Sequence, residues 1–251
     1  MRNAPRALIA GLGLIGGSIG MALRARGWHV GYVDPNVDEQ DAQRASAADE
    51  RAESLDAPTD IIVIATPVDV AVKLLGTRHS ALGTSVCSVM QPLREAAKSA
   101  NFIAGHPLAG SHEHGLSAAR ADLLRARAWF IEKHDDLLDR LVNDCGARIE
   151  IVSAKEHDAA VALTSHLPQL LSTALASYLD EQKIEERFIG SGLRTFLRLA
   201  GSDSSVWMPV LEANRMNIAP HAAAVEEIVR TILRGDASAF QRAQNLWSRL
   251  Q

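Results

Sequence analysis

Three glycines near the N-terminus, Gly11, Gly13 and Gly16, have the spacing G-x-G-x-x-G, directly after a short apolar run. In this pattern the first glycine permits a tight turn, the second lets the backbone approach a pyrophosphate, and the third lets a helix pack close to a sheet. Leu14 and Ile15 stand in the same turn, where the positive end of that helix would face the anion. We therefore expect these five residues to bind a dinucleotide cofactor.

Asp34 follows the predicted strand His29–Val33 and lies 18 residues after Gly16. A carboxylate at this position can accept hydrogen bonds from a ribose 2′-hydroxyl and repels a 2′-phosphate. The five residues that follow it contain no arginine or lysine, and Arg44 is the nearest cation, expected on the next helix. The sequence therefore favours NAD over NADP.

His106 lies between the short predicted strand 102–104 and Pro107. The proline stiffens the loop predicted for residues 105–115, so the imidazole would be held at the carboxyl edge of a sheet. A neutral histidine there can accept a proton at physiological pH. The chemistry alone fits a histidine bonded to the loop backbone equally well.

Ser165 and His166 precede Pro168 inside the alanine-rich helical stretch 159–176. The proline should kink this helix. A kink that carries two polar side chains is compatible with a binding site, and equally with a histidine that only satisfies the carbonyl groups freed by Pro168.

Arg194 and Arg198 are four residues apart on a predicted helix, and so share one of its faces. Two neighbouring guanidinium groups make a surface that binds carboxylates. Arginines on a helix are more often simply solvated, and that alternative stays open.

The overall composition excludes several classes of partner. The net charge of −4 gives no reason to expect nucleic acid or an anionic membrane surface. No apolar run approaches the roughly 20 residues that a membrane-spanning helix needs, and the N-terminus leads directly into the first strand with no room for a signal peptide. Two isolated cysteines, Cys87 and Cys145, suggest a reducing compartment, so a cytoplasmic protein is expected. No cysteine and histidine cluster has the spacing of a metal site.

Strand and helix patterns alternate through the first 152 residues. The run 61–65 is continuously apolar, as in a parallel strand covered on both faces, and it ends at Thr66 and Pro67 on the edge where ligands bind. We expect a doubly wound parallel sheet of the Rossmann type. Its expected strands are 7–10, 29–33, 61–65, 84–89, 102–104, 128–131 and 148–152, and its expected helices are 14–23, 40–48, 68–75, 93–100 and 135–145.

Residues 153–251 carry helical patterns only, in the segments 154–181, 184–200, 204–217, 219–233 and 236–250. We therefore expect a dinucleotide-binding domain over 1–152 and an all-helical domain over 153–251. Five helices in so short a segment can hardly bury every apolar face, so the helical domain should form a homodimer.

Several of these stretches together resemble the prephenate/arogenate dehydrogenase family. In the printed sequence the matching pieces are 11–18, 65–68, 105–111, 157–158, 165–168, 192–200 and 207–214. The resemblance implies a Rossmann domain, a helical dimerisation domain, and the oxidative decarboxylation of a cyclohexadienyl acid with NAD(P)+.

By position, His106 resembles the catalytic histidine that hydrogen-bonds the ring hydroxyl of the substrate. Arg198 resembles the arginine that binds a substrate carboxylate, and His166 lies in the motif that lines the substrate cleft. The resemblance implies that Ser165, Arg194 and Ser111 take part in substrate binding.

The chain departs from the family pattern where Met90 replaces a usual serine, Gln169 a frequent histidine and Thr195 a common aspartate. Our first hypothesis is the NAD-dependent conversion of prephenate to 4-hydroxyphenylpyruvate, on the route to tyrosine. The same chemistry on arogenate or 4-amino-4-deoxyprephenate is a second, and a cofactor-binding regulatory protein without turnover is a third. A β-hydroxyacid dehydrogenase is disfavoured, because neither Lys155 nor Lys183 lies in a Lys-x-x-Asn pattern.

Overall fold

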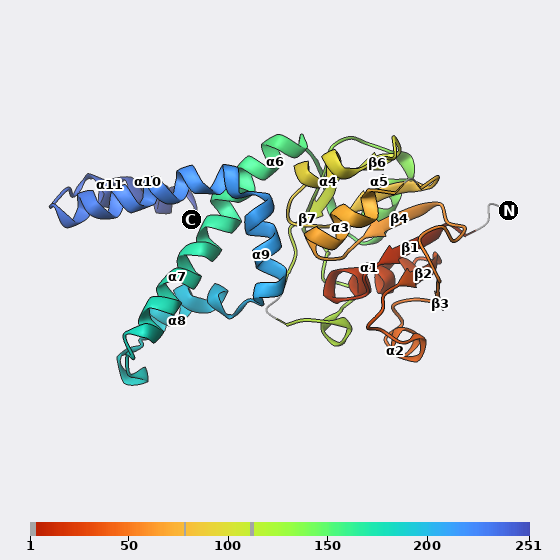
Figure 1. The fold of residues 1–251 in the computed structure, drawn as a ribbon, viewed down its shortest axis with the longest axis horizontal. Helices are drawn as coiled ribbons and strands as arrows, with labels where there is room; N and C mark the ends of the chain where they lie inside the picture. The colour runs from red at the N-terminus through yellow and green to blue at the C-terminus, as the bar shows by residue number, and fades with distance from the viewer. Residues whose placement is uncertain (1–3, 78, 111–112) are drawn as a thin grey trace.

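The computed structural model describes residues 4–77, 79–110 and 113–251. Its N-terminal half contains a six-stranded parallel sheet with the strand order β3-β2-β1-β4-β5-β6 (Figure 1). The strands are β1 (Arg6–Ala10), β2 (His29–Val33), β3 (Glu50–Arg51), β4 (Ile61–Ile64), β5 (Leu82–Ser85) and β6 (Phe102–Ile103). The sequence predicted a parallel sheet but missed its short edge strand β3. It also wrongly placed the strands at 128–131 and 148–152 in this sheet, since they belong to a second one.

Strand β1 is the centre of the sheet, paired with β2 on one side and β4 on the other. The chain builds outward from β1 to β3 and then crosses back to β4, so the carboxyl ends of β1 and β4 meet where the strand order reverses. Open α/β sheets bind their ligands at this point. Gly11 follows β1 and Ala65 follows β4, which brings both predicted cofactor segments to this edge.

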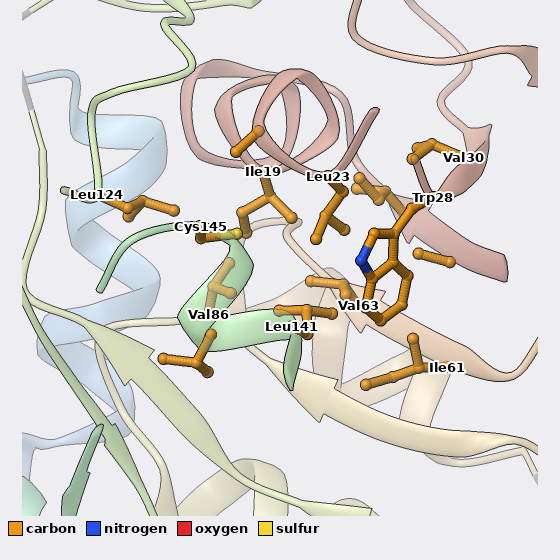
Figure 2. Packing of buried hydrophobic residues seen from close by; sticks show 14 of the residues in the cluster. Ile19, Leu23, Trp28, Val30, Ile61, Val63, Val86, Leu124, Leu141 and Cys145 are labelled. Carbon is orange, nitrogen blue, oxygen red and sulfur yellow. The ribbon is translucent and has the colours of Figure 1, made fainter. Parts of the chain in front are cut away.

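Helices cover both faces of the sheet. Alternate residues of β1 point to opposite faces, and each joins a separate apolar cluster. Figure 2 shows the cluster under α1 (Leu14–Arg24) and α5 (Asp136–Asp144), where Ile19, Leu23 and Leu141 pack on the strands. The opposite face is covered by α3 (Val68–Leu75) and α4 (Gln91–Ala96). This two-sided burial explains why the central strands are continuously apolar.

A second, three-stranded sheet carries His106. It consists of β7 (Gly105–Pro107), β8 (Ala128–Ile131) and β9 (Arg148–Ile151) in that order. The prediction of a loop from residue 105 was wrong at its start, because β7 pairs antiparallel with β8 and places His106 opposite Phe130. The predicted strand over 84–89 was also displaced toward the C-terminus, since β5 begins at Leu82 and ends at Ser85.

The C-terminal half is helical. Its first helix runs without a break through α6 (Ala154–Val161), a π-helical turn η2 (Ala162–His166) and α7 (Leu167–Glu181). Ser153 and Glu156 form a reciprocal cap at its start. Pro168 has no N–H to continue the regular ladder, and the wider π turn immediately before it accommodates that loss.

Helix α9 (Ser204–Ala213) packs beside α3 of the α/β half, whereas α7 and α10 extend away from that half and diverge from one another (Figure 1). Helix α10 begins at Arg215 and continues through Pro220, so the break expected near residue 218 lies instead at Asn214. None of the helices in the described ranges is long and apolar enough to cross a membrane. The other helices of the α/β half are α2 (Glu39–Arg44) and η1 (Leu116–Ala118). Those of the helical half are η3 (Glu186–Phe188), α8 (Ser191–Leu197), η4 (Arg198–Gly201), α9 (Ser204–Ala213), α10 (Arg215–Leu233) and α11 (Ser238–Arg249).

Candidate active site

The glycine turn between β1 and α1 leaves no room for side chains at two positions. Gly11 has a φ of +92°, and a Cβ atom there would lie 2.6 Å from the carbonyl oxygen of Ala65. A Cβ atom on Gly16 would lie 2.0 Å from the carbonyl oxygen of Gly11. At Gly13, by contrast, a Cβ atom would meet nothing within 4 Å. The turn therefore brings α1 close to the sheet and leaves an open backbone surface at Gly13, which is the N-cap of α1.

Asp34 is tied to this turn. Its carboxylate accepts the backbone N–H of Leu12 at 2.8 Å and that of Asn36 at 2.8 Å. With Gly13, Asp34 lines a cavity of about 730 Å³. Arg44, at the end of α2, lines the same cavity and is paired with Asp41. The cavity thus presents a carboxylate beside a backbone turn, the arrangement that receives an adenosine ribose and pyrophosphate.

A second cavity, of about 550 Å³, lies between the α/β half and the helical half. It shares Gly13 and Gly115 with the first cavity. The predicted site residues that line it are Gly13, Leu14, Ile15, Thr66, Pro67, His106 and Ser165. The fold therefore gathers into one cavity residues that lie up to about 150 positions apart in the chain.

The wall of this second cavity also includes residues to which the sequence assigned no role in the site. Cys87 and Ser88 follow β5, and Ser202, Asp203 and Trp207 come from the start of α9 and the segment before it. Cys87 is a buried free thiol whose pKa is raised to about 12 by burial. This thiol is therefore a packing group and not a nucleophile.

His106 is buried, with 8% of its surface exposed. Burial, together with the nearby imidazoles of His157 and His166, lowers the pKa of His106 to about 3. The side chain is consequently neutral at physiological pH and able to accept a proton.

Two further buried residues extend from His106. Its Nδ1 lies 2.9 Å from Nε2 of His157, and Nδ1 of His157 lies 2.8 Å from Oδ1 of Asp158. The Asp158 carboxylate also accepts the backbone N–H groups of Met90 and Gln91, at 2.8 and 2.9 Å. These residues form a buried chain from the start of α4 to His106.

His166 belongs to the same network. The side-chain amide of Asn214 reaches both the backbone oxygen of Asp158, at 2.8 Å, and Nδ1 of His166, at 3.0 Å. The ring of His166 stands edge-on to Trp207. Burial lowers the pKa of His166 to about 4; Asp158 opposes this shift and His157 adds to it. Both histidines that the sequence singled out are therefore neutral and connected through Asp158.

The two predicted arginines lie apart from this network. Arg194 is exposed and paired with Glu186 at 3.0 Å. Arg198 is exposed at the start of η4, and it is not among the described residues that line either cavity. The segment that follows it, at Ser202 and Asp203, does line the second cavity. Ser111, also predicted to bind substrate, lies outside the described residues.

The residues that connect the two histidines were only partly recognisable from the sequence. His157 and Asp158 are adjacent in the chain, and the matched piece 207–214 ends at Asn214. No role could be assigned to them from sequence, because His157 contacts a residue 51 positions away and Asn214 contacts one 56 positions away.

Two family models match the chain. The first, described as the nucleotide-binding domain of prephenate dehydrogenase, matches residues 19–151. The second, described as the dimerization domain of prephenate dehydrogenase, matches residues 153–243.

Individual relatives agree with these models. The chain is 31% identical over 244 residues to a prephenate dehydrogenase of Bacillus subtilis, covering 84% of this chain and 64% of the relative. It is 32% identical over 248 residues to a probable prephenate dehydrogenase of Streptomyces niveus, covering 90% of this chain and 66% of the relative. The chain thus spans a little under two thirds of the length of these curated relatives.

Among solved structures, the fold is similar to that of a prephenate dehydrogenase of Aquifex aeolicus crystallised with hydroxyphenyl propionate and NAD+. The TM-score is 0.82 at 23% sequence identity, and the match covers 99% of each chain. This match confirms the predicted combination of a Rossmann-type sheet with a helical second half.

Proposed function

The chain belongs to the prephenate dehydrogenase family, and from that premise we propose that it catalyses the NAD-dependent oxidative decarboxylation of prephenate to 4-hydroxyphenylpyruvate. One observation carries the proposal. The cavity of about 550 Å³ is lined at once by the glycine turn, by the end of β4, by His106 and by Ser165 of the helical half. A cofactor and a small substrate would meet there beside one buried neutral base.

The described residues fit a dinucleotide. Gly11 and Gly16 have no space for side chains, Gly13 is open, and Asp34 lines the cavity next to it. The positive end of α1 would face the pyrophosphate, with Leu14 and Ile15 in its first turn, and Thr66 and Pro67 would flank the nicotinamide end. When bound, NAD+ supplies an acceptor for the hydride that leaves C4 of the substrate ring.

His106 acts on the proton of the 4-hydroxyl group. As the hydride departs, the imidazole takes this proton and the C4 oxygen becomes a carbonyl. Loss of the ring carboxylate as CO2 then returns an electron pair to the ring, which becomes aromatic, and the resulting phenolate recovers the proton from His106. The base is therefore unchanged after each turnover.

The rest of the site positions the substrate. We assign Arg198 to a substrate carboxylate, with Ser165, His166, Arg194 and Ser111 contributing to binding. Because aromatisation drives the reaction, the protein mainly holds the ring against the cofactor and keeps water out. Arg198 is exposed at the start of η4, directly before the segment that brings Ser202 and Asp203 into the cavity wall.

We further propose that residues 1–152 and 153–251 act as two domains and that the helical domain forms a homodimer. The second family model supports the dimer, and so does the exposed apolar surface of the helical half. The free thiols of Cys87 and Cys145 fit the reducing cytoplasm, where we expect the enzyme to act.

The test uses the purified full chain with NAD+ or NADP+ and one of three substrates: prephenate, arogenate or 4-amino-4-deoxyprephenate. Formation of reduced cofactor is followed by its absorbance, and the aromatic product is identified by mass spectrometry. We expect the highest kcat/KM with prephenate and NAD+. A higher value with either amino-substituted ring would move the proposal to that substrate, and binding of NAD+ without turnover of any substrate would indicate a regulatory protein.

A further inference from the structure

Asp158 is hydrogen-bonded to both arms of the network that contains the two site histidines. Its carboxylate contacts His157, and His157 contacts His106. Its backbone oxygen contacts Asn214, and Asn214 contacts His166. Asp158 and His166 are at most 1% exposed and His157 is 2% exposed, so water does not compete for these bonds.

The direction of each hydrogen bond follows from Asp158. A carboxylate only accepts, and its two oxygens already accept backbone N–H groups of Met90 and Gln91. Nδ1 of His157 must therefore be the donor to Asp158. In a neutral imidazole the other nitrogen is then an acceptor, so Nδ1 of His106 donates to Nε2 of His157. This leaves the lone pair of His106 on Nε2.

The second arm gives His166 the opposite tautomer. Oδ1 of Asn214 accepts from Asn217 at 2.7 Å, which identifies the other amide atom as the NH2 group. That group donates to the backbone oxygen of Asp158 and to Nδ1 of His166. His166 therefore carries its proton on Nε2, the buried atom that has no hydrogen-bond partner among the described residues.

We propose that Asp158 and His157 are positioning residues that fix His106 as a base with its lone pair on Nε2, and that His157 takes over the positive charge when His106 accepts a proton. This inference rests on the proposed function. As Nε2 of His106 takes the hydroxyl proton, its Nδ1 proton moves to Nε2 of His157. The imidazolium so formed lies against the Asp158 carboxylate. Both transfers reverse when the phenolate recovers its proton.

The burial of His106 supports this division of roles. Burial disfavours an imidazolium at His106, and so do the nearby rings of His157 and His166. An imidazolium at His157 is in direct contact with a carboxylate. Buried charge is tolerated when it is paired in this way. Met90 contributes only its backbone N–H, which it donates to Asp158. The side chains that support His106 are therefore those of His157 and Asp158 on α6.

The first experiment does not depend on turnover. Protein labelled with 15N-histidine is studied by NMR above neutral pH, and each ring is assigned from a single histidine substitution. We expect the proton on Nδ1 of His106 and His157, and on Nε2 of His166. A proton on Nε2 of His106 would overturn the proposal, even if the enzyme were active. The expected tautomers in a protein inactive on every substrate would leave this positioning role standing while the proposed function failed.

The second experiment separates orientation from proton transfer. In His157→Gln, Oε1 can still accept from His106 but cannot take its proton, so kcat should fall about tenfold or more while KM changes less than about twofold. In His157→Leu, the tautomer of His106 is no longer fixed, and kcat should fall about 100-fold or more. Asp158→Asn should shift the His106 ring toward the Nε2–H form.

Phe130→Leu is the matched control, because Phe130 packs edge-on against His157 without hydrogen-bonding to it. Its kcat should stay within about threefold of wild type, with the tautomers unchanged. A wild-type kcat in His157→Gln would refute the proton transfer, and a retained Nδ1–H form of His106 in His157→Leu would refute the positioning role.

Discussion

Oδ2 of Asp34 accepts the backbone N–H of Leu12 at 2.8 Å, so the acid at the end of β2 is fastened to the glycine turn that follows β1. This one contact therefore joins the two segments that we propose for the ribose and the pyrophosphate of the cofactor. Oδ1 is fixed as well, by the N–H of Asn36. Both carboxylate oxygens are thus held in place in the cavity, where the proposed function has them accept hydrogen bonds from ribose hydroxyls.

Asp34→Ser should change the cofactor preference. The substitution removes the charge that repels a 2′-phosphate, while Arg44 remains in the wall of the same cavity. We expect the Kd for NAD+ to rise about tenfold and the Kd for NADP+ to fall, as measured by fluorescence titration. The double variant Asp34→Ser, Arg44→Ala is the control, and it should not show the lower Kd for NADP+. A wild-type protein that already prefers NADP+ would contradict the assignment of Asp34.

His106→Asn should remove the base and keep the local structure. The amide of asparagine can replace Nδ1–H as a donor to His157, but nothing replaces the lone pair on Nε2. We expect kcat to fall about 10²–10⁴-fold with a smaller change in KM, because proton transfer matters only in the transition state. Steady-state kinetics with saturating NAD+ give both values, and an unchanged kcat would show that His106 is not the base.

Arg198→Ala should act on binding. A guanidinium that holds a carboxylate equally in the ground and transition states mainly lowers KM. We expect KM for the substrate to rise about 30-fold or more, with kcat little changed and with no effect on the Kd for NAD+. Arg194→Ala, on the same helical segment but paired with Glu186, is the comparison and should have the smaller effect. Equal KM values for wild type and Arg198→Ala would remove Arg198 from the site.

Local patterns were sufficient to predict most of the sheet. The apolar runs that form β2, β4 and β8, the helix 68–75 and the glycine turn all depend on residues close together in the chain. Strand β7 was missed because Gly-His-Pro has little β propensity, and its pairing with β8 comes from residues more than 20 positions away. The π turn at η2 could be anticipated only as a kink at Pro168.

The chemistry of the site was less predictable than the fold. His106 and His166 stood out as single residues, but their tautomers depend on Asp158, which meets His106 only through His157. The placement of Arg198 depends on how η4 packs on α7, where Gln169 donates to the backbone oxygen of Leu199 at 2.8 Å. Such contacts between distant segments leave no periodic signal in a single sequence.

The helical half should form a two-fold dimer. Large apolar side chains are strongly exposed on α10 and α11, including Met216 at 86%, Leu233 at 82% and Trp247 at 65%. Exposure of this kind over neighbouring helices is typical of a covered interface. Light scattering at micromolar concentration should give the mass of a dimer, and Leu233→Glu should shift it toward a monomer. Val70→Glu, at an exposed position on the α/β half, should leave the dimer intact. A monomeric wild type would contradict this prediction.

The buried neutral histidines should make the fold sensitive to acid. The pKa of His106 is lowered to about 3 and that of His166 to about 4, against 6.5 for an ordinary imidazole. Below about pH 6.5 these two histidines therefore bind protons in the unfolded chain but not in the folded one. The free energy of unfolding consequently falls as the pH falls. Each histidine should cost about 2 kcal/mol between pH 7 and about pH 5.

Urea unfolding at a fixed protein concentration, followed by circular dichroism at both pH values, measures this loss. His166→Asn is the informative variant, since its Oδ1 can still accept from Asn214 while the group that titrates is gone. It should reduce the loss of stability by about half. His134→Asn alters an exposed histidine that pairs with Asp139, and this variant should lose nearly as much stability on acidification as wild type. If His166→Asn and wild type lost the same stability on acidification, His166 would take up its proton as readily in the folded protein as in the unfolded chain. Its Nδ1 could then not be the acceptor that the network assigns to it opposite Asn214.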